Sequence, residues 1–153
     1  MIFFQNKYKY HILHYPYESS GIVINDKEEI LLIQSKCYVT SKLEWEIPAE
    51  RIEENETPED AVRRECLGET GCTLKDLTDL CCQNPNNGMS DLRVHVFGAR
   101  VGSESSLFDT NEVHDRKWVP KNKIMGMLQS NEIQCGVSML VLLYAMNFYV
   151  WFS

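Results

Sequence analysis

Zinc-ligand spacings are missing from this sequence. Its six cysteines are Cys37, Cys66, Cys72, Cys81, Cys82 and Cys135. They include no C-x-x-C pair and no grouping with histidine, which excludes a zinc site of the usual spacing. Cys66, Cys81 and Cys82 lie within apolar patterns, where a free thiol behaves as a small hydrophobic side chain. Cysteines of this kind are typical of a reducing compartment, and we predict a cytoplasmic protein.

An excess of positive charge is also absent. The chain has 15 lysines and arginines against 22 aspartates and glutamates, a net charge of −7 at pH 7. Duplex nucleic acid is bound by a broad cationic face, so we expect no nucleic-acid partner. With 44% hydrophobic and 24% charged residues among 153, the composition is that of a globular protein with a sizeable core.

Long apolar segments are lacking at both ends of the chain. The first ten residues, MIFFQNKYKY, have neither the apolar stretch nor the small-residue cleavage site of a signal peptide. The most apolar segment is 137–152, whose 16 residues include Asn147 and have no basic flank. Because a membrane span needs about 20 apolar residues, we predict a buried helix here and no membrane partner. A membrane-binding or partner-binding tail is the alternative.

Repeats, low-complexity stretches and linkers are absent as well, which favours one domain. The predicted strands are GIVIND and EEILLIQS as a hairpin, then EWEIP, 74–82, LRVHVFGARV and RKWVP. The predicted helices are 58–69, KNKIMGML and the segment from Gly136 onward. Strands mixed with helices before, between and after them predict an α/β fold with a sheet between helices.

The helix at 58–69 has clear start and stop signals. Thr57 can cap its amino end, Pro58 suits the first helical position, and Asp60 can close a capping box. Gly71 suits the left-handed conformation that commonly ends a helix.

Glu65 and Glu69 give this helix an acidic face. They are four residues apart on one side of the helix, where like charges repel weakly. The nearby acids Glu56, Glu59 and Asp60 increase the repulsion. A hard divalent cation would offset it, because Mg²⁺ takes oxygen ligands and neutralises phosphates. A solvated acidic helix without a ligand is the alternative.

From Glu50 to Cys72 the chain resembles a Nudix box, whose pattern is Gly, five residues, Glu, seven residues, Arg-Glu-apolar-x-Glu-Glu-x-Gly-apolar. The matching positions are Glu56, Arg64, Glu65, Cys66, Glu69, Gly71 and Cys72. The resemblance implies one Nudix-type domain over 1–153, with an amino-terminal extension at 1–20 and the box at 50–72. It further implies an α/β/α sandwich with a central mixed β-sheet. The implied reaction is Mg²⁺-assisted hydrolysis of a nucleoside diphosphate linked to another group.

The same resemblance gives roles to individual residues. Glu65 and Glu69 would be catalytic metal ligands, and Ala49 would offer its backbone carbonyl to the metal. Arg64 and Glu56 would form a supporting ion pair. The implied cofactor is Mg²⁺, with Mn²⁺ as the other ion that could serve.

Three further segments resemble the ADP-ribose pyrophosphatase branch of the family: WEIPAERIEENETPEDA, NPNNGMSDLRVHVFGA and DTNEVHDRKWVP. This implies an ADP-ribose-like nucleotide substrate, cleaved to AMP and ribose 5-phosphate, and a homodimer. Glu112 would be the general base or the water-positioning residue. Trp45 could stack on a nucleobase, with a half-buried strand residue as the alternative. Lys36 would contact substrate beside Cys37, where the branch keeps an arginine.

Four positions depart from the family pattern where it places metal or substrate: Gly68, Glu50, Leu92 and Cys37. Gly68 removes one carboxylate, which would weaken the hold on a second or third metal. Glu50 stands where the box opens with glycine, and its backbone would be strained if its φ were positive. These departures keep a second interpretation open, a Nudix-like module that binds or senses a nucleotide without hydrolysing it.

Overall fold

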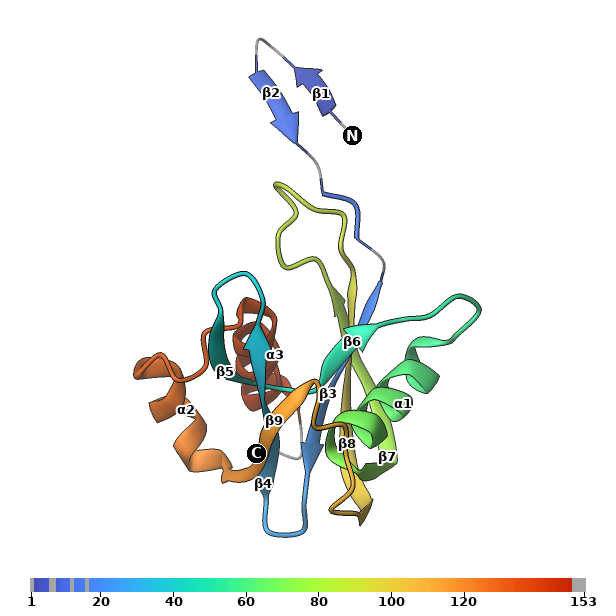
Figure 1. Ribbon diagram of the computed structural model, residues 1–153, viewed down its shortest axis with the longest axis vertical. Helices are drawn as coiled ribbons and strands as arrows, with labels where there is room; N and C mark the ends of the chain where they lie inside the picture. Colours follow the sequence, from blue (N-terminus) through green and yellow to red (C-terminus); the bar gives the residue numbers. More distant parts are fainter. Residues whose placement is uncertain (1, 6–7, 12, 16, 150–153) are drawn as a thin grey trace.

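A sheet with helices on both of its faces organises the chain (Figure 1). The computed structural model describes residues 2–5, 8–11, 13–15 and 17–149. The strands of the main sheet are β3 (Glu18–Ile24), β4 (Glu29–Cys37), β5 (Lys42–Glu46), β6 (Ala49–Arg51), β7 (Cys72–Gln83), β8 (Val94–Glu104) and β9 (Val113–Pro120). The helices are α1 (Pro58–Thr70), α2 (Lys121–Gln129) and α3 (Gly136–Phe148).

The sheet is mixed, as predicted. Its strands run in the order β5-β4-β3-β8-β7, with β6 paired to β3 and β9 paired to β4. Strands β3 and β8 are parallel over their whole contact, from Glu18 opposite Val94 to Ile24 opposite Arg100. The other pairs are antiparallel. The predicted hairpin of β3 and β4 forms, but its two strands pair only at Ile24 and Ile30, because each finds its longer partner elsewhere.

Both faces of the sheet are buried. Along β3, Ile22 and Ile24 join the larger core cluster, to which α2 and α3 contribute. Val23, between them, points to the other face and packs with Cys66 of α1. This alternation follows from the period-two geometry of a strand. It confirms the α/β/α sandwich, with α1 on one side of the sheet and α2 and α3 on the other (Figure 1).

Helix α1 begins and ends as its sequence indicates. The Thr57 hydroxyl accepts a hydrogen bond of 3.1 Å from the Asp60 amide, and Pro58 occupies the first turn. The helix extends one residue beyond the predicted end and is closed by Gly71, whose φ is +69°. The Gly71 carbonyl then accepts a bond of 3.0 Å from the Ser105 amide, which ties the helix end to the loop between β8 and β9.

The apolar carboxy-terminal segment forms α3, which buries Ser138, Val141, Leu142 and Ala145. This confirms the predicted helix as far as Phe148; Tyr149 is extended, and 150–152 lie outside the described residues. Among the described helices, none is long and apolar enough to cross a membrane.

The structure changes two predictions, the burial of Cys82 and the extent of the amino-terminal extension. Cys66 is buried as predicted, but Cys82 is exposed on β7, because the apolar pattern there belongs to a strand with one outward face. Within the expected amino-terminal extension at 1–20, β1 (Ile2–Gln5) and β2 (Tyr8–His11) form a separate two-stranded sheet at one end of the molecule (Figure 1). The last residues of the extension, from Glu18, already belong to β3.

Candidate active site

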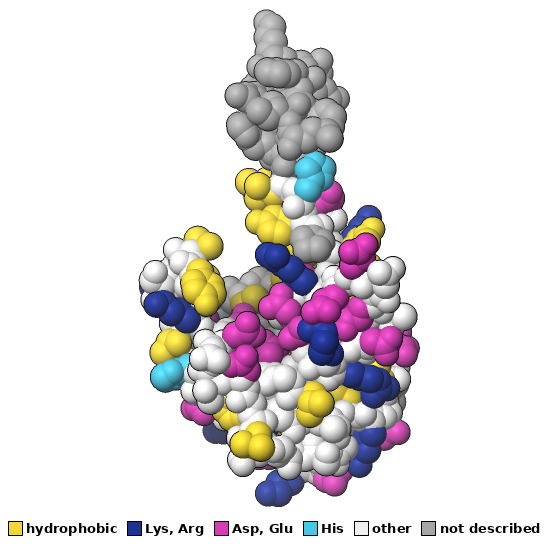
Figure 2. All heavy atoms as spheres, turned by 45° about the vertical axis from the view of Figure 1, so that its right-hand side comes forward, with side chains coloured by type: hydrophobic (Ala, Val, Ile, Leu, Met, Phe, Trp, Pro, Cys, Tyr) yellow, Lys and Arg dark blue, Asp and Glu magenta, His cyan; other side chains and the backbone are white. Residues whose placement is uncertain are grey.

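Two adjoining cavities lie between α1, β6, the end of β4 and the loop between β8 and β9. The first, of about 350 Å³, is lined by Glu50, Glu53, Arg64, Glu65, Gly68, Glu69, Asp109 and Glu112. The second, of about 250 Å³, is lined by Ser35, Lys36, Tyr38, Glu46, Ala49, Glu50, Glu69, Asn111 and Glu112. Because they share Glu50, Glu69 and Glu112, we describe them together as the acidic cleft. Figure 2 shows acidic side chains gathered in a band across this part of the surface.

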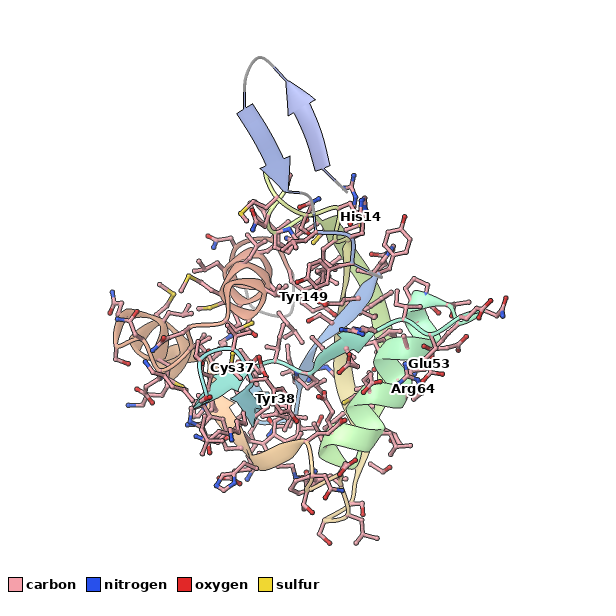
Figure 3. All side chains as sticks on the ribbon, turned by 45° about the horizontal axis from the view of Figure 1, so that its top comes forward. His14, Cys37, Tyr38, Glu53, Arg64 and Tyr149 are labelled. Carbon is pink, nitrogen blue, oxygen red and sulfur yellow. The ribbon has the colours of Figure 1, made fainter. Side chains whose placement is uncertain are left out.

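The fold brings most of the predicted site residues to the acidic cleft. Glu65 and Glu69 of α1 line the first cavity together with Glu112, which comes from the loop before β9. Ala49 and Lys36 line the second. The cleft therefore extends from α1 to the far end of β4. Figure 3 shows the same span, with Arg64 and Glu53 beside α1 and with Cys37 and Tyr38 where β4 ends.

Trp45 is not among the residues that line the acidic cleft. Its ring is half-buried against the larger core cluster. The ammonium of Lys117 lies 3.8 Å from the ring centroid, in a cation–π contact. In this arrangement one face of the indole is covered by Lys117 of β9, a strand that pairs with β4 as β5 does.

Arg64 and Glu56 form a two-pronged ion pair. Nε of Arg64 donates to Oε1 of Glu56 at 2.7 Å, and Nη2 donates to Oε2 at 2.8 Å. The Arg64 guanidinium lowers the pKa of Glu56 to about 2, chiefly through these bonds. Nη2 also donates to the Arg51 carbonyl at 3.1 Å. Helix α1 is thereby fixed to the preceding loop, in which Asn55 has a φ of +65°.

Arg64 reaches two more carboxylates along the wall of the cleft. Its Nη1 donates to Oε1 of Glu65 and lies 4.0 Å from Oε1 of Glu53. Glu65 is therefore compensated by a cation within the protein. Arg64 thus binds one of the two predicted metal ligands directly, in addition to its predicted partner Glu56.

Glu69 is compensated much less. Its side chain is 7% exposed, and its Oε2 has no hydrogen-bond partner among the described residues. Burial raises the pKa of Glu69 to about 8, and repulsion from Glu46, Glu50 and Glu112 adds to the rise. A hydrogen bond from the Ala49 backbone acts in the opposite direction. A buried carboxylate oxygen without a partner is costly, and a bound cation would satisfy it.

The donor set of the cleft fits a hard divalent ion. Mg²⁺ and Mn²⁺ in proteins are bound by carboxylate oxygens and backbone carbonyl oxygens. Within residues 13–15 and 17–149, no three His, Cys, Asp or Glu side chains are already gathered tightly enough to hold a metal. Two causes lie in the site itself: Arg64 holds Glu65, and the remaining carboxylates repel one another.

The raised pKa of Glu69 predicts a pH-dependent stability for the metal-free protein. Because the folded protein binds this proton more tightly than the unfolded chain, protonation of Glu69 stabilises the folded state. This stabilisation is complete below about pH 4.5 and is lost as the pH rises through about 8. We therefore expect the melting temperature, measured in a chelator, to fall over this window more steeply in the wild type than in Glu69→Gln. Because all other titrating groups are shared, the difference between the two curves isolates Glu69. Parallel curves would contradict the prediction.

Two acids of the cleft, Glu46 and Asp109, were not among the predicted site residues. Glu46 accepts a hydrogen bond from the Ser35 hydroxyl on β4, and burial raises its pKa. Its place between the apolar residues Trp45 and Ile47 was the one signal in the sequence that this carboxylate is not fully exposed. No such signal exists for Asp109. This residue lies at the cleft because its backbone amide donates a hydrogen bond of 2.9 Å to the Gly68 carbonyl of α1.

The departures from the family pattern have different structural outcomes. Glu50 is unstrained, since it lies in β6 opposite Ser19 and is not among the residues with positive φ. The condition for strain at this position is therefore not met, because Glu50 belongs to a short paired strand. Leu92 packs against the larger core cluster and so has become a structural residue. Cys37 lies at the end of β4 beside Lys36.

Comparison with known proteins gives one family. The model of the NUDIX domain matches residues 15–134. An ADP-ribose pyrophosphatase of Bacillus subtilis (strain 168) is 28% identical over 128 residues, covering 82% of this chain and 69% of that protein. A CMP-5'-(N-acetyl-N-hydroxy-3-aminopropyl)phosphonate hydrolase of Streptomyces rubellomurinus is 24% identical over 126 residues, 80% of this chain and 60% of that protein. The fold matches a NUDIX hydrolase from Nitrosomonas europaea with a TM-score of 0.71 at 18% identity, over 87% and 90% of the two chains.

Proposed function

The chain belongs to the NUDIX domain family, and from that premise we propose that it hydrolyses the diphosphate of an ADP-ribose-like nucleotide with the help of a divalent metal ion. The products from ADP-ribose itself would be AMP and ribose 5-phosphate. The observation that carries the proposal is the buried Glu69 carboxylate, which has an oxygen without a hydrogen-bond partner among the described residues and is repelled by Glu46, Glu50 and Glu112. The similarity to the Bacillus subtilis pyrophosphatase supports the choice of substrate.

In this proposal Glu65 and Glu69 hold the ion, and Ala49 lies beside it in β6. Mg²⁺ is the proposed cofactor, and Mn²⁺ would serve in its place. When bound, the ion neutralises the oxygens of the diphosphate. Arg64 and Glu56 keep α1 and the preceding loop in register. For Glu65 to bind the ion, Arg64 must break its contact with Glu65. The two bonds to Glu56 would keep the Arg64 guanidinium in place after that contact is broken.

Glu112 is the proposed general base. It lines both cavities from the loop that precedes β9, and its side chain is exposed. Its carboxylate would accept the proton of the attacking water while the water oxygen bonds to phosphorus. The phosphorus–oxygen bond to the leaving phosphate then breaks, and the leaving oxygen carries the electron pair. Lys36, on the opposite wall, supplies a cation for the phosphates.

Trp45 remains a predicted base-stacking residue. Stacking would require Lys117 to leave the indole ring, on which its ammonium now lies. A homodimer and a cytoplasmic location also remain predictions. The mass of the purified chain in solution, measured by light scattering, tests the first of these.

The direct test is hydrolysis by the purified full-length chain. We expect AMP and ribose 5-phosphate from ADP-ribose in Mg²⁺ or Mn²⁺, followed by chromatography, and no products in a chelator. Glu112→Gln should lower kcat by roughly 10²-fold or more, the usual contribution of a general base. Glu44→Gln, an acid outside the cleft, is the control and should leave the rate unchanged. An absence of turnover over a panel of nucleoside diphosphate derivatives would overturn the enzyme proposal.

A module that binds a nucleotide without cleaving it is the second candidate. The contact between Arg64 and Glu65 favours it, because a ligand held by an internal cation is a weaker ligand for a metal. Titration calorimetry with ADP-ribose distinguishes the two. Heat of binding without AMP release would support the module, and turnover would exclude it.

A further inference from the structure

We propose that Glu50 supplies a metal-site carboxylate from the opposite wall of the acidic cleft, in place of the side chain that Gly68 lacks. The divalent ion would then be held by Glu50 together with Glu69. This inference rests on the proposed function, since it assumes that the cleft binds a divalent ion. It adds a ligand that is particular to this chain.

The wall of the cleft is open at Gly68. A Cβ placed on this residue would meet no other atom within 4 Å, so the space beside the helix is unfilled. Gly68 and Glu50 line the same cavity, one from α1 and the other from β6. The Glu50 side chain therefore has room to extend toward the helix.

Glu50 is held firmly and yet has coordinating capacity. Its backbone is part of β6, where it pairs with Ser19 of β3. Its Oε1 accepts a hydrogen bond of 2.9 Å from the Arg51 amide. For the other oxygen of Glu50, the described residues provide no hydrogen bond or ion pair within contact distance. A half-buried carboxylate on a paired strand, with one oxygen free, is a preorganised ligand.

Two other acids of the first cavity differ from Glu50 in their surroundings. Glu65 is ion-paired with Arg64. Asp109 is exposed in the loop between β8 and β9, and its Oδ1 accepts two bonds from Asn111, at 2.8 and 2.9 Å.

Glu69 provides the independent sign that a cation belongs between these walls. Its Oε2 is buried and has no hydrogen-bond partner within the described part of the chain, and Glu50 is one of the acids whose charge repels it. Two carboxylates that repel across a cavity in the absence of metal become joint ligands in its presence. A hard divalent cation is the ligand class that this pair fits.

The test is a direct measurement of Mn²⁺ affinity on the full chain, by electron paramagnetic resonance of the free ion and by calorimetry. We expect Glu50→Gln to weaken Mn²⁺ binding by at least about tenfold, since even indirect supports of a metal site cost that much. The matched control is Glu54→Gln, which removes an exposed acid from the loop that follows β6 and should stay within about twofold of the wild type. Gly68→Glu, added to Glu50→Gln, should recover most of the lost affinity, because position 68 has open space.

Each outcome decides the matter. Equal Mn²⁺ affinity in the wild type and Glu50→Gln would overturn the role of Glu50 and leave the proposed function standing. A loss that Gly68→Glu fails to recover, in a variant whose circular dichroism matches the wild type, would also overturn it. If Glu50→Gln does not fold, Glu50→Ser in the Gly68→Glu background replaces it, and wild-type-like affinity there is the supporting result. A wild type that neither binds Mn²⁺ nor hydrolyses any nucleotide would remove the proposed function itself.

Discussion

Glu69→Gln is expected to lower hydrolysis by roughly 10³-fold, the scale on which a lost metal ligand affects phosphoryl chemistry, and at the same time to raise the melting temperature of the metal-free protein. The two effects have one cause. Glu69 is buried, and one of its carboxylate oxygens has no hydrogen-bond partner among the residues that the structure describes, so its charge destabilises the empty site. The same charge attracts the metal. A neutral amide of equal size removes both.

The measurements are kcat/KM for ADP-ribose in saturating Mg²⁺ and the melting temperature in a chelator at about pH 8, where the wild-type carboxyl is substantially ionised. Glu59→Gln is the matched control, since Glu59 is an exposed acid in the first turn of the same helix. It should change the rate little and lower stability slightly through the helix dipole. An unaffected rate in Glu69→Gln would remove this residue from the metal site. A lowered melting temperature would show that its charge is compensated in the empty protein.

Local signals in the sequence were sufficient to predict α1 and much of the cleft. Thr57, Pro58 and Gly71 fix the two ends of the helix through contacts within a few residues. Once the helix is placed, the spacing of Glu65 and Glu69 puts both on one wall. The pairing of Arg64 with Glu56 likewise spans one loop. These predictions depend on short-range geometry, which the order of residues determines almost alone.

What the sequence could not predict depends on long-range register. Glu46 reaches the cleft because β5 pairs with β4 in a register that sets Ser35 opposite Glu44. Asp109 reaches it because a loop folds onto the end of α1 through the Gly68 carbonyl. Whether Trp45 is free to stack depends on Lys117, a residue of β9. A one-residue shift in any of these pairings would turn a different side chain into the cleft.

The contact between Arg64 and Glu65 also lay beyond the motif. The motif indicates that Arg64 supports the loop through Glu56, and it does so with two bonds. It does not indicate that the third guanidinium nitrogen reaches the neighbouring carboxylate. The empty site thus contains an internal competitor for the ion at Glu65, whereas Oε2 of Glu69 has no hydrogen-bond partner among the described residues.

Two glycines at the end of α1 should respond to alanine in opposite directions. Gly71→Ala should destabilise the fold by about 3 kcal/mol, combining a strained positive φ with a steric clash. Its Cβ would lie 2.5 Å from the Leu107 carbonyl oxygen and 2.6 Å from that of Ser105. Gly68→Ala should stabilise by roughly 0.5–1 kcal/mol, because the residue is helical and its Cβ would meet open space.

Urea unfolding of the two variants and the wild type measures both signs, and the m-value checks that the transition stays two-state. Gly71→Ala should also lower hydrolysis, because the loop that Gly71 anchors through Ser105 continues to Glu112. Gly68→Ala leaves that anchor intact and serves as the matched control for an added methyl group at the site. Equal stability of Gly71→Ala and the wild type would mean that the loop between β8 and β9 can move away from the helix end at little cost. In that case the position of Glu112 would be set by β9 alone, and the loop would not be a fixed wall of the cleft.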